Sequence, residues 1–350
     1  MLNLKLISVI VAVIRKIIPT FARYFLIMIR AYIKGTGSYT PPKILKNDFF
    51  EAVGSSDEWI FKNLGIKERR IAEGEVTSDL ASKAAIKALK NAGIAATEVD
   101  LIVLATSTPD RQAPSTACFV QEKIGAPNAV AFDISAVCSG GLYGLAIGCQ
   151  FIQTGMYKNV LVIGADTFST ITDWTRKDSV FFGDGAGAIL LSATEEDKGF
   201  FDFKMHTDGT GKMHFNIPAG GCEIPATAET IEQGLQYFQM NGKEVYETAT
   251  RVLPECINEI LEANHLKSED VDWVIPHQPS IRILQKVAAE VNIPFEKVMT
   301  NMEKYANTSG GTIPIVLDET FKSGKIKEGN ILLFAAVGSG WTWGTALYKV

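Results

Sequence analysis

Short, continuously apolar segments alternate with longer segments of helical periodicity along most of the chain. Residues 101–106 (LIVLAT) and 160–164 (VLVIG) are apolar runs of strand length, as expected for strands that are covered on both faces. Residues 78–92 carry apolar side chains along one helical stripe and precede Gly93, a common helix stop. Because the alternation continues to the end of the chain, the pattern predicts a layered α/β protein. The second half contributes a helix at 252–263 and strands at 271–275 and 331–337.

Two short segments echo one another in the two halves of the chain. Residues 136–141 (AVCSGG) and 305–311 (YANTSGG) each follow a predicted strand and precede a predicted helix. A duplicated α/β unit explains this echo, so we expect one half at residues 31–200 and the other at 201–350. The stretch 195–239 has little periodicity and many Gly, Thr and Pro residues, which predicts a long loop excursion.

Residues 1–30 form an N-terminal extension that differs from the rest of the chain. They contain five basic residues and no acidic residue, among Leu, Ile, Val and Phe. The apolar stretch 2–14 is shorter than the roughly 20 residues that a membrane-spanning helix needs. On a helical wheel the basic residues share one arc, which predicts an amphipathic helix in weak contact with a membrane surface through residues 1–27. The alternative is a start at Met28, which would make residues 1–27 a misassigned extension without a role.

Composition narrows the class of protein. The 350 residues are 47% hydrophobic and 21% charged, which is typical of a folded globular chain. The net charge of -5 argues against a nucleic-acid partner. The five cysteines are odd in number and show no CxxC spacing, so a reducing cytoplasm fits best. The four histidines are scattered, and we predict no metal site from them.

Cys138 is the first candidate for chemistry. It follows the predicted strand 130–134 and precedes a helix with four glycines, which indicates a helix packed closely against other backbone segments. A cysteine at a helix start feels the positive end of the helix dipole, which favours the thiolate. From position alone, a nucleophile and a small buried apolar cysteine are equally good interpretations.

His277 and Asn307 occupy comparable positions in the second half. His277 ends the predicted strand 271–275, where open α/β sheets place polar groups that carry chemistry. Asn307 stands at the strand-to-helix corner that echoes the corner of Cys138. Taken singly, they are better explained as a structural histidine and a helix cap. Together with Cys138 they predict a site, because two neutral donors aimed at one thioester oxygen stabilise the enolate that malonyl decarboxylation leaves.

Three other classes compete with this interpretation. A papain-like protease shares the order Cys, His, Asn, but its tryptophan-flanked cysteine signature is absent. A phosphate-binding loop at 182–188 would need a helix after it, and residues 189–191 read as a strand. A non-catalytic acyl-binding scaffold would not need the complete set of Cys138, His277 and Asn307.

These residues and their surroundings resemble β-ketoacyl-(acyl carrier protein) synthase III and its relatives in the thiolase superfamily. The resemblance extends from about Ile33 to Val350. Its motifs, in chain order, are GTGSY at 35–39, SDEWI at 56–60, FGDGAGA at 182–188, PHQ at 276–278, NTS at 307–309 and WG at 343–344.

The resemblance implies a thiolase-like α/β fold, in which two similar βαβαβαββ halves form five αβαβα layers, and a cytoplasmic homodimer. It implies an acyltransferase that initiates fatty acid synthesis by decarboxylative Claisen condensation of an acyl-CoA primer with malonyl-acyl carrier protein, giving a 3-oxoacyl thioester. Cys138 would carry the acyl group, while His277 and Asn307 would drive decarboxylation. Asparagine in the third position is typical of the initiating class, since elongating relatives carry a histidine there. No cofactor or metal is implied; acyl-CoA and the acyl carrier protein are the partners.

Further roles follow from the same resemblance. The backbone amides of Cys138 and Ser339 would form the oxyanion hole, although the family often has glycine at the position of Ser339. Trp59 and Arg176 would hold the adenine of coenzyme A between them. The full substrate-binding set is Trp59, Arg176, Ala113, Phe182 and Met240, and Arg282 with Lys286 would dock the carrier protein.

Several departures from the family pattern bear on the substrate. Asn63 replaces an arginine that helps to bind coenzyme A phosphates. Ala113 falls where a phenylalanine closes the acyl pocket across the dimer, so we expect primers longer than acetyl. These changes keep open a secondary-metabolite ketosynthase of the same superfamily, making alkylquinolones, dialkylresorcinols or head-to-head condensed lipids. The positions where acetyl-primed members have carrier-binding lysines are Glu247, Ala289 and Glu290.

Overall fold

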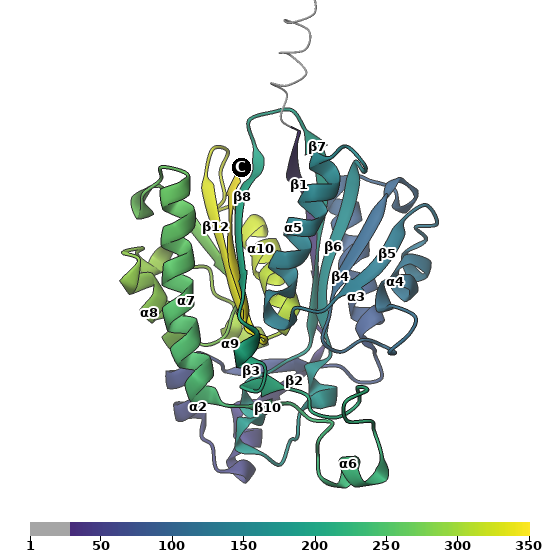
Figure 1. Cartoon of the computed structure of the whole chain (residues 1–350), viewed down its shortest axis with the longest axis vertical. Helices are drawn as coiled ribbons and strands as arrows, with labels where there is room; N and C mark the ends of the chain where they lie inside the picture. Colours follow the sequence, from purple (N-terminus) through teal and green to yellow (C-terminus); the bar gives the residue numbers. More distant parts are fainter. Residues whose placement is uncertain (1–28) are drawn as a thin grey trace, which may run out of the picture.

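The computed structural model describes residues 29–350, which form two mixed β-sheets separated and flanked by helices (Figure 1). The predicted N-terminal helix and the alternative start at Met28 lie outside the described residues. No helix within 29–350 is long and apolar enough to cross a membrane. The first sheet has the order β1-β7-β6-β4-β5, and the second has the order β11-β12-β13-β8.

The first sheet is built from the apolar runs that the sequence predicts as strands. β4 pairs in parallel with β5 and β6, and β7 pairs antiparallel with β6 and β1. The side chains of β4 are buried throughout, as expected for a strand covered on both faces. The strand bounds are β1 (Arg30–Tyr39), β4 (Leu101–Ala105), β5 (Val130–Ile134), β6 (Asn159–Asp166) and β7 (Gly185–Thr194).

The second sheet repeats the pairing pattern of the first. β11 pairs in parallel with β12, and β13 pairs antiparallel with β12 and β8. The counterpart of β5 is reduced to a parallel bridge between Val274 and Val298. The topology therefore fits the predicted duplication. The strand bounds are β8 (Gly199–Thr207), β11 (Trp273–Pro276), β12 (Ile331–Gly338) and β13 (Thr342–Lys349).

Helices complete five layers around the two sheets. Two helices lie between the sheets, where their apolar side chains share one core with both, and two more cover the outer face of each sheet (Figure 1). The inner pair is α5 (Gly140–Gln153) and α10 (Thr312–Lys322), and the outer pairs are α3 (Thr77–Ala92) with α4 (Thr116–Ile124) and α7 (Gly242–Ala263) with α8 (Ile281–Glu290). The remaining short elements are β2 (Lys43–Lys46), α2 (Asp57–Leu64), β3 (Glu68–Ile71), β9 (Phe215–Asn216), α6 (Ala228–Glu232), β10 (Gln239–Met240) and α9 (Met302–Tyr305).

The predicted loop excursion at 195–239 was wrong for its first part. Residues 199–207 form β8, which pairs with β13 along its length. Asp202, Lys204 and His206 alternate with less polar residues, so the strand lacks the continuous apolar run that marks β4 and β6. The predicted helix at 252–263 also begins earlier, at Gly242.

The two halves meet at glycine positions where backbones touch. A Cβ atom on Gly164 of β6 would lie 2.0 Å from the carbonyl oxygen of Gly310, and one on Gly141 of α5 would lie 2.7 Å from the same oxygen. Neither contact is possible for a residue with a side chain. The turn that contains Gly310 is η9 (Ser309–Gly311), directly before α10.

We predict that Gly164→Ala destabilises the protein by about 3 kcal/mol or more, since the added methyl must displace the backbone of the opposite half. Urea denaturation followed by circular dichroism measures the change. Gly221→Ala is the matched control, because a Cβ there meets no atom within 4 Å. Equal stability of the two variants would show that the contact between the halves is adjustable.

Candidate active site

Cys138 sits on a strained turn between β5 and α5. The turn is η3 (Val137–Ser139), and α5 begins at Gly140. Val137 has a φ of 45°, in the left-handed region that β-branched residues avoid. Such a conformation costs about 1–3 kcal/mol and persists only where the surrounding structure enforces it. The turn places the Cys138 sulfur in the wall of a cavity rather than in the core.

His277 follows β11, and its backbone and side chain are both held. Its amide donates to Ala335 of β12 at 2.8 Å, and its Nδ1 lies 2.7 Å from the hydroxyl oxygen of Thr312 at the start of α10. Thr312 donates its one hydroxyl proton to the carbonyl of Ser309. Its oxygen therefore accepts from His277, which assigns the proton to Nδ1 and leaves Nε2 as an acceptor.

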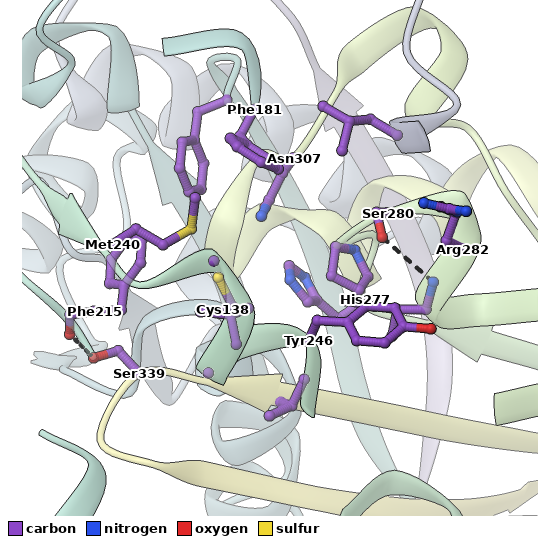
Figure 2. Close-up of a pocket in the computed structure, with 18 of the residues that line it drawn as sticks. Cys138, Phe181, Phe215, Met240, Tyr246, His277, Ser280, Arg282, Asn307 and Ser339 are labelled. Carbon is purple, nitrogen blue, oxygen red and sulfur yellow. Dashed lines mark hydrogen bonds between the residues drawn. The ribbon is translucent and has the colours of Figure 1, made fainter. Parts of the chain in front are cut away.

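Asn307 is fixed by backbone and side-chain hydrogen bonds. Its amide donates to Phe181 at 3.1 Å, and its carbonyl accepts from Gly183 at 3.0 Å. The side-chain Oδ1 accepts from the amide of Ser309 at 2.8 Å. This bond turns the carboxamide nitrogen toward the cavity (Figure 2). The glycine-rich motif at 182–188 thus positions a catalytic candidate. It continues into the strand β7 and not into the helix that a phosphate-binding loop requires.

The three side chains face one space. Figure 2 shows the Cys138 sulfur, the Asn307 nitrogen and the His277 ring directed into the same cavity. The cavity has a volume of about 360 Å³ and is lined mostly by apolar side chains. Phe182 and Phe215 of its wall pack with Phe168 and Phe238 in one aromatic cluster.

Burial keeps both titratable members of this site uncharged. Burial raises the pKa of the Cys138 thiol to about 12, against hydrogen bonds from Ser309 and Asn307 that lower it. Loss of hydration outweighs these bonds and opposes the effect expected of the helix start, which favours the thiolate. Burial lowers the pKa of His277 to about 3, so its imidazole is neutral. The resting pair is a thiol and an unprotonated Nε2.

Sequence reasoning missed Ser309 and Asp166. The Ser309 hydroxyl lies 3.8 Å from the Cys138 sulfur. Asp166, fully buried at the end of β6, accepts from the amides of Gly310 and Ser107 at 3.1 and 2.7 Å. Burial raises its pKa to about 6. The position of Asp166 at the end of a buried strand was the available signal, the same one that marked His277.

Asp166 joins the two halves directly beneath the nucleophile. Its carboxylate comes from the first sheet, and Gly310 belongs to the turn between Asn307 and α10. It also accepts from the hydroxyls of Thr106 and Thr108 at 3.2 and 3.1 Å. These four hydrogen bonds therefore tie the turn that follows Asn307 to the ends of β4 and β6 in the first half.

The predicted oxyanion residues line the same cavity. Cys138, Gly338 and Ser339 all line it, and Ser339 lies in the connection between β12 and β13. The Ser339 hydroxyl donates to the carbonyl of Phe215 in β9 (Figure 2). A serine at this position therefore anchors its own backbone to the aromatic cluster.

The structure brings together most, but not all, of the predicted substrate residues. Trp59, Phe182, Met240 and Arg282 line the cavity. Ala113 is exposed on a loop outside it, and Lys286 lies on α8 without lining it.

Trp59 and Arg176 do not face each other as a pair. Arg176 forms an ion pair with Asp178 at 2.5 Å, and Lys177 lies over the Trp59 ring at 5.9 Å from its centroid. Trp59 is 43% exposed at the mouth of the cavity, where Arg282 donates to Asn63 at 2.8 Å. The cation next to Trp59 in this chain is therefore Lys177.

The five layers and the cysteine, histidine and asparagine at one cavity define a thiolase-like condensing enzyme. Family models agree: one described as 3-oxoacyl-[acyl-carrier-protein (ACP)] synthase III matches residues 132–209, and its C-terminal counterpart matches residues 261–350. The solved structure of 3-oxoacyl-[acyl-carrier-protein] synthase III from Aquifex aeolicus is 42% identical, with a TM-score of 0.85, and the match covers 91% of this chain and 100% of that one.

Curated relatives identify the family. The β-ketoacyl-[acyl-carrier-protein] synthase III of Caldanaerobacter subterraneus is 47% identical over 92% of this chain and 98% of its own length. That of Clostridioides difficile is 46% identical over 91% and 98%. The chain belongs to the β-ketoacyl-acyl carrier protein synthase III family. It is an acyltransferase with the activity that initiates fatty acid synthesis, as the motifs predicted.

We predict that alkylation of Cys138 by iodoacetamide accelerates about tenfold per pH unit up to about pH 9.5 without a plateau, because the raised pKa leaves the thiolate a minor form throughout. A variant that lacks the exposed Cys118 and Cys222 restricts the signal to the active site. Intact-mass spectrometry measures the rate. A plateau at or below about pH 8 would mean that the helix start overcomes burial.

Proposed function

We propose that Cys138, His277 and Asn307 carry out this activity on an acyl-CoA primer and a malonyl-acyl carrier protein. The observation that supports the proposal is the arrangement of one acceptor and one donor beside the sulfur: Nε2 of His277 and the carboxamide nitrogen of Asn307. We also propose that the enzyme works in the cytoplasm as a homodimer, with Ala113 near the acyl chain of the partner subunit, and that its halves divide near residue 200.

In the first half-reaction, Cys138 attacks the primer carbonyl. Nε2 of His277 takes the thiol proton as the S–C bond forms, and returns it to the departing coenzyme A sulfur. Because burial keeps the imidazole neutral at rest, its Nε2 is unprotonated and can accept the thiol proton. The backbone amides of Cys138 and Ser339 hold the oxyanion. The products are acyl-Cys138 and free coenzyme A.

In the second half-reaction, Asn307 stabilises the enolate. Its carboxamide nitrogen donates to the malonyl thioester oxygen while the C–C bond to the carboxylate breaks and carbon dioxide leaves. The apolar wall excludes water and favours the loss of charge from the carboxylate.

The enolate carbon then attacks acyl-Cys138, and the sulfur leaves as a thiolate. The step consumes one proton, because the malonyl carboxylate departs as neutral carbon dioxide and the thiolate must be reprotonated. A proton taken up on Nε2 lets His277 donate first to the enolate oxygen and then to Cys138. The donor role that the sequence analysis expects of His277 thus belongs to this charged intermediate form and not to the resting enzyme.

We predict that Asn307→Ala acylates Cys138 at close to the normal rate but loses condensation by about 100- to 1,000-fold, the usual cost of one oxyanion donor. In contrast, His277→Ala slows acylation itself by about 100-fold or more, because the thiol proton loses its acceptor. Intact-mass spectrometry after mixing with acyl-CoA measures the first step, and release of labelled carbon dioxide from malonyl-acyl carrier protein measures the second. Asn128→Ala, at an exposed asparagine far from the cavity, is the control. Loss of both steps to the same extent in Asn307→Ala would contradict the division of roles.

The apolar cavity supports a primer longer than acetyl, and in the proposed dimer the small side chain of Ala113 would leave room for its acyl chain. We predict that octanoyl-CoA acylates Cys138 faster than acetyl-CoA. Ala113→Phe is expected to reverse the preference, because the larger side chain would fill the space of the acyl chain, and Ala95→Phe on an exposed loop serves as the control. Incubation with both thioesters together, followed by intact-mass spectrometry, measures the ratio of the two acylation rates. Equal or faster turnover with acetyl-CoA would contradict the assignment.

A further inference from the structure

Three potential metal ligands gather on the outer side of the second sheet, away from the catalytic cavity. His206 lies near the end of β8, and Cys256 and Glu259 lie one turn apart on α7. One ligand atom from each residue lies within 4.8 Å of the other two. The Nε2 of His206 is 2.7 Å from a carboxylate oxygen of Glu259. The two side chains on α7 face the same strand because a spacing of three residues returns to one side of a helix.

The histidine ring is oriented before any ligand arrives. It stacks on Trp343 of the neighbouring strand, with ring centroids 5.5 Å apart and planes inclined by 21°. Its backbone carbonyl accepts from the hydroxyl of Tyr143 on α5 at 2.8 Å. A ligand that is already oriented loses little conformational freedom on binding.

The surroundings suit a cation. Cys256 is buried, and its sulfur contacts Thr345 at 3.4 Å and the carbonyl of Lys204 at 3.9 Å. Glu259 supplies a negative charge. Lys204 brings a positive charge near Cys256, and Asp202 pairs with it at 3.0 Å. His206 and Glu259 both retain solvent exposure, so an ion can enter from the surface.

We propose that His206, Cys256 and Glu259 bind a divalent transition-metal ion of the Zn²⁺ class, with a water molecule as fourth ligand. Imidazole, thiolate and carboxylate are the three ligand types that zinc prefers. A tetrahedral ion with bonds of 2.0–2.3 Å separates its ligand atoms by about 3.3–3.8 Å, which small rotations of the two exposed side chains reach from the observed positions. On binding, a metal–sulfur bond replaces the sulfur–hydrogen bond of Cys256, and the proton passes to solvent.

An ion at this position would clamp α7 to β8. The first turn of α7 carries Val245 and Tyr246 in the wall of the catalytic cavity, about three helical turns from Cys256. The proposed site is therefore separate from the reacting groups, yet lies on an element that shapes the substrate cavity.

The test uses the full chain with Cys138→Ala, so that zinc cannot bind to the catalytic thiol. Equilibrium dialysis against zinc chloride is expected to show one ion per chain. Cys256→Ser is expected to weaken binding at least 30-fold, and Glu259→Gln at the exposed ligand is expected to weaken it measurably without a risk to folding. Cys118→Ser, which removes an exposed thiol elsewhere, is the control and should bind normally.

Cobalt(II) gives an independent readout. The cobalt-loaded protein is expected to show a thiolate-to-cobalt charge-transfer band that Cys256→Ser abolishes and Cys118→Ser retains. Absence of stoichiometric zinc binding in the Cys138→Ala protein would overturn the proposal. So would zinc binding that neither Cys256→Ser nor Glu259→Gln affects.

Discussion

The contact between η9 and the end of the first sheet is the constraint on which the site depends. The Gly310 carbonyl lies where a side chain on Gly141 or Gly164 would otherwise stand, and the Gly310 amide donates to buried Asp166. This contact brings the turn that carries Asn307 against the turn that carries Cys138, although the two residues are far apart in the chain. A larger residue at either glycine would separate the nucleophile from its donor, so the fold and the chemistry impose the same requirement.

The close fit also explains why the Cys138 thiol and the His277 imidazole are uncharged at rest. Packed backbones and an aromatic cluster leave little water around the sulfur or the imidazole, and both groups favour their neutral forms. Charge then develops only during the reaction, on an oxyanion or an enolate, where fixed donors are already in place. An ionised thiolate would be the more reactive nucleophile, but a site with little water stabilises a resting thiolate poorly. The fixed donors of this site stabilise the transition state instead.

Much of this could be predicted from the sequence, and the remainder has physical reasons. Continuous apolar runs marked β4, β6 and β12, and the echoed corners marked Cys138 and Asn307, because these signals are local. β8 was missed since its polar residues alternate, and its place in the sheet depends on pairing with β13, which is distant in the chain. Ser309 was missed because its contact with Cys138 arises only when the halves meet, whereas Asp166 was missed although its place at the end of β6 was a signal.

The tautomer of His277 shows how one turn sets two catalytic groups. The Thr312 hydroxyl donates a hydrogen bond to the carbonyl of Ser309, so its oxygen accepts from Nδ1 of His277, and Nε2 is left as an acceptor. The backbone N–H of the same residue, Ser309, donates to Oδ1 of Asn307 and so presents the carboxamide nitrogen to the cavity. The acceptor for the thiol proton and the donor for the enolate are therefore oriented by a single backbone turn. A change in that turn would alter both half-reactions together, whereas a change in either side chain alone separates them.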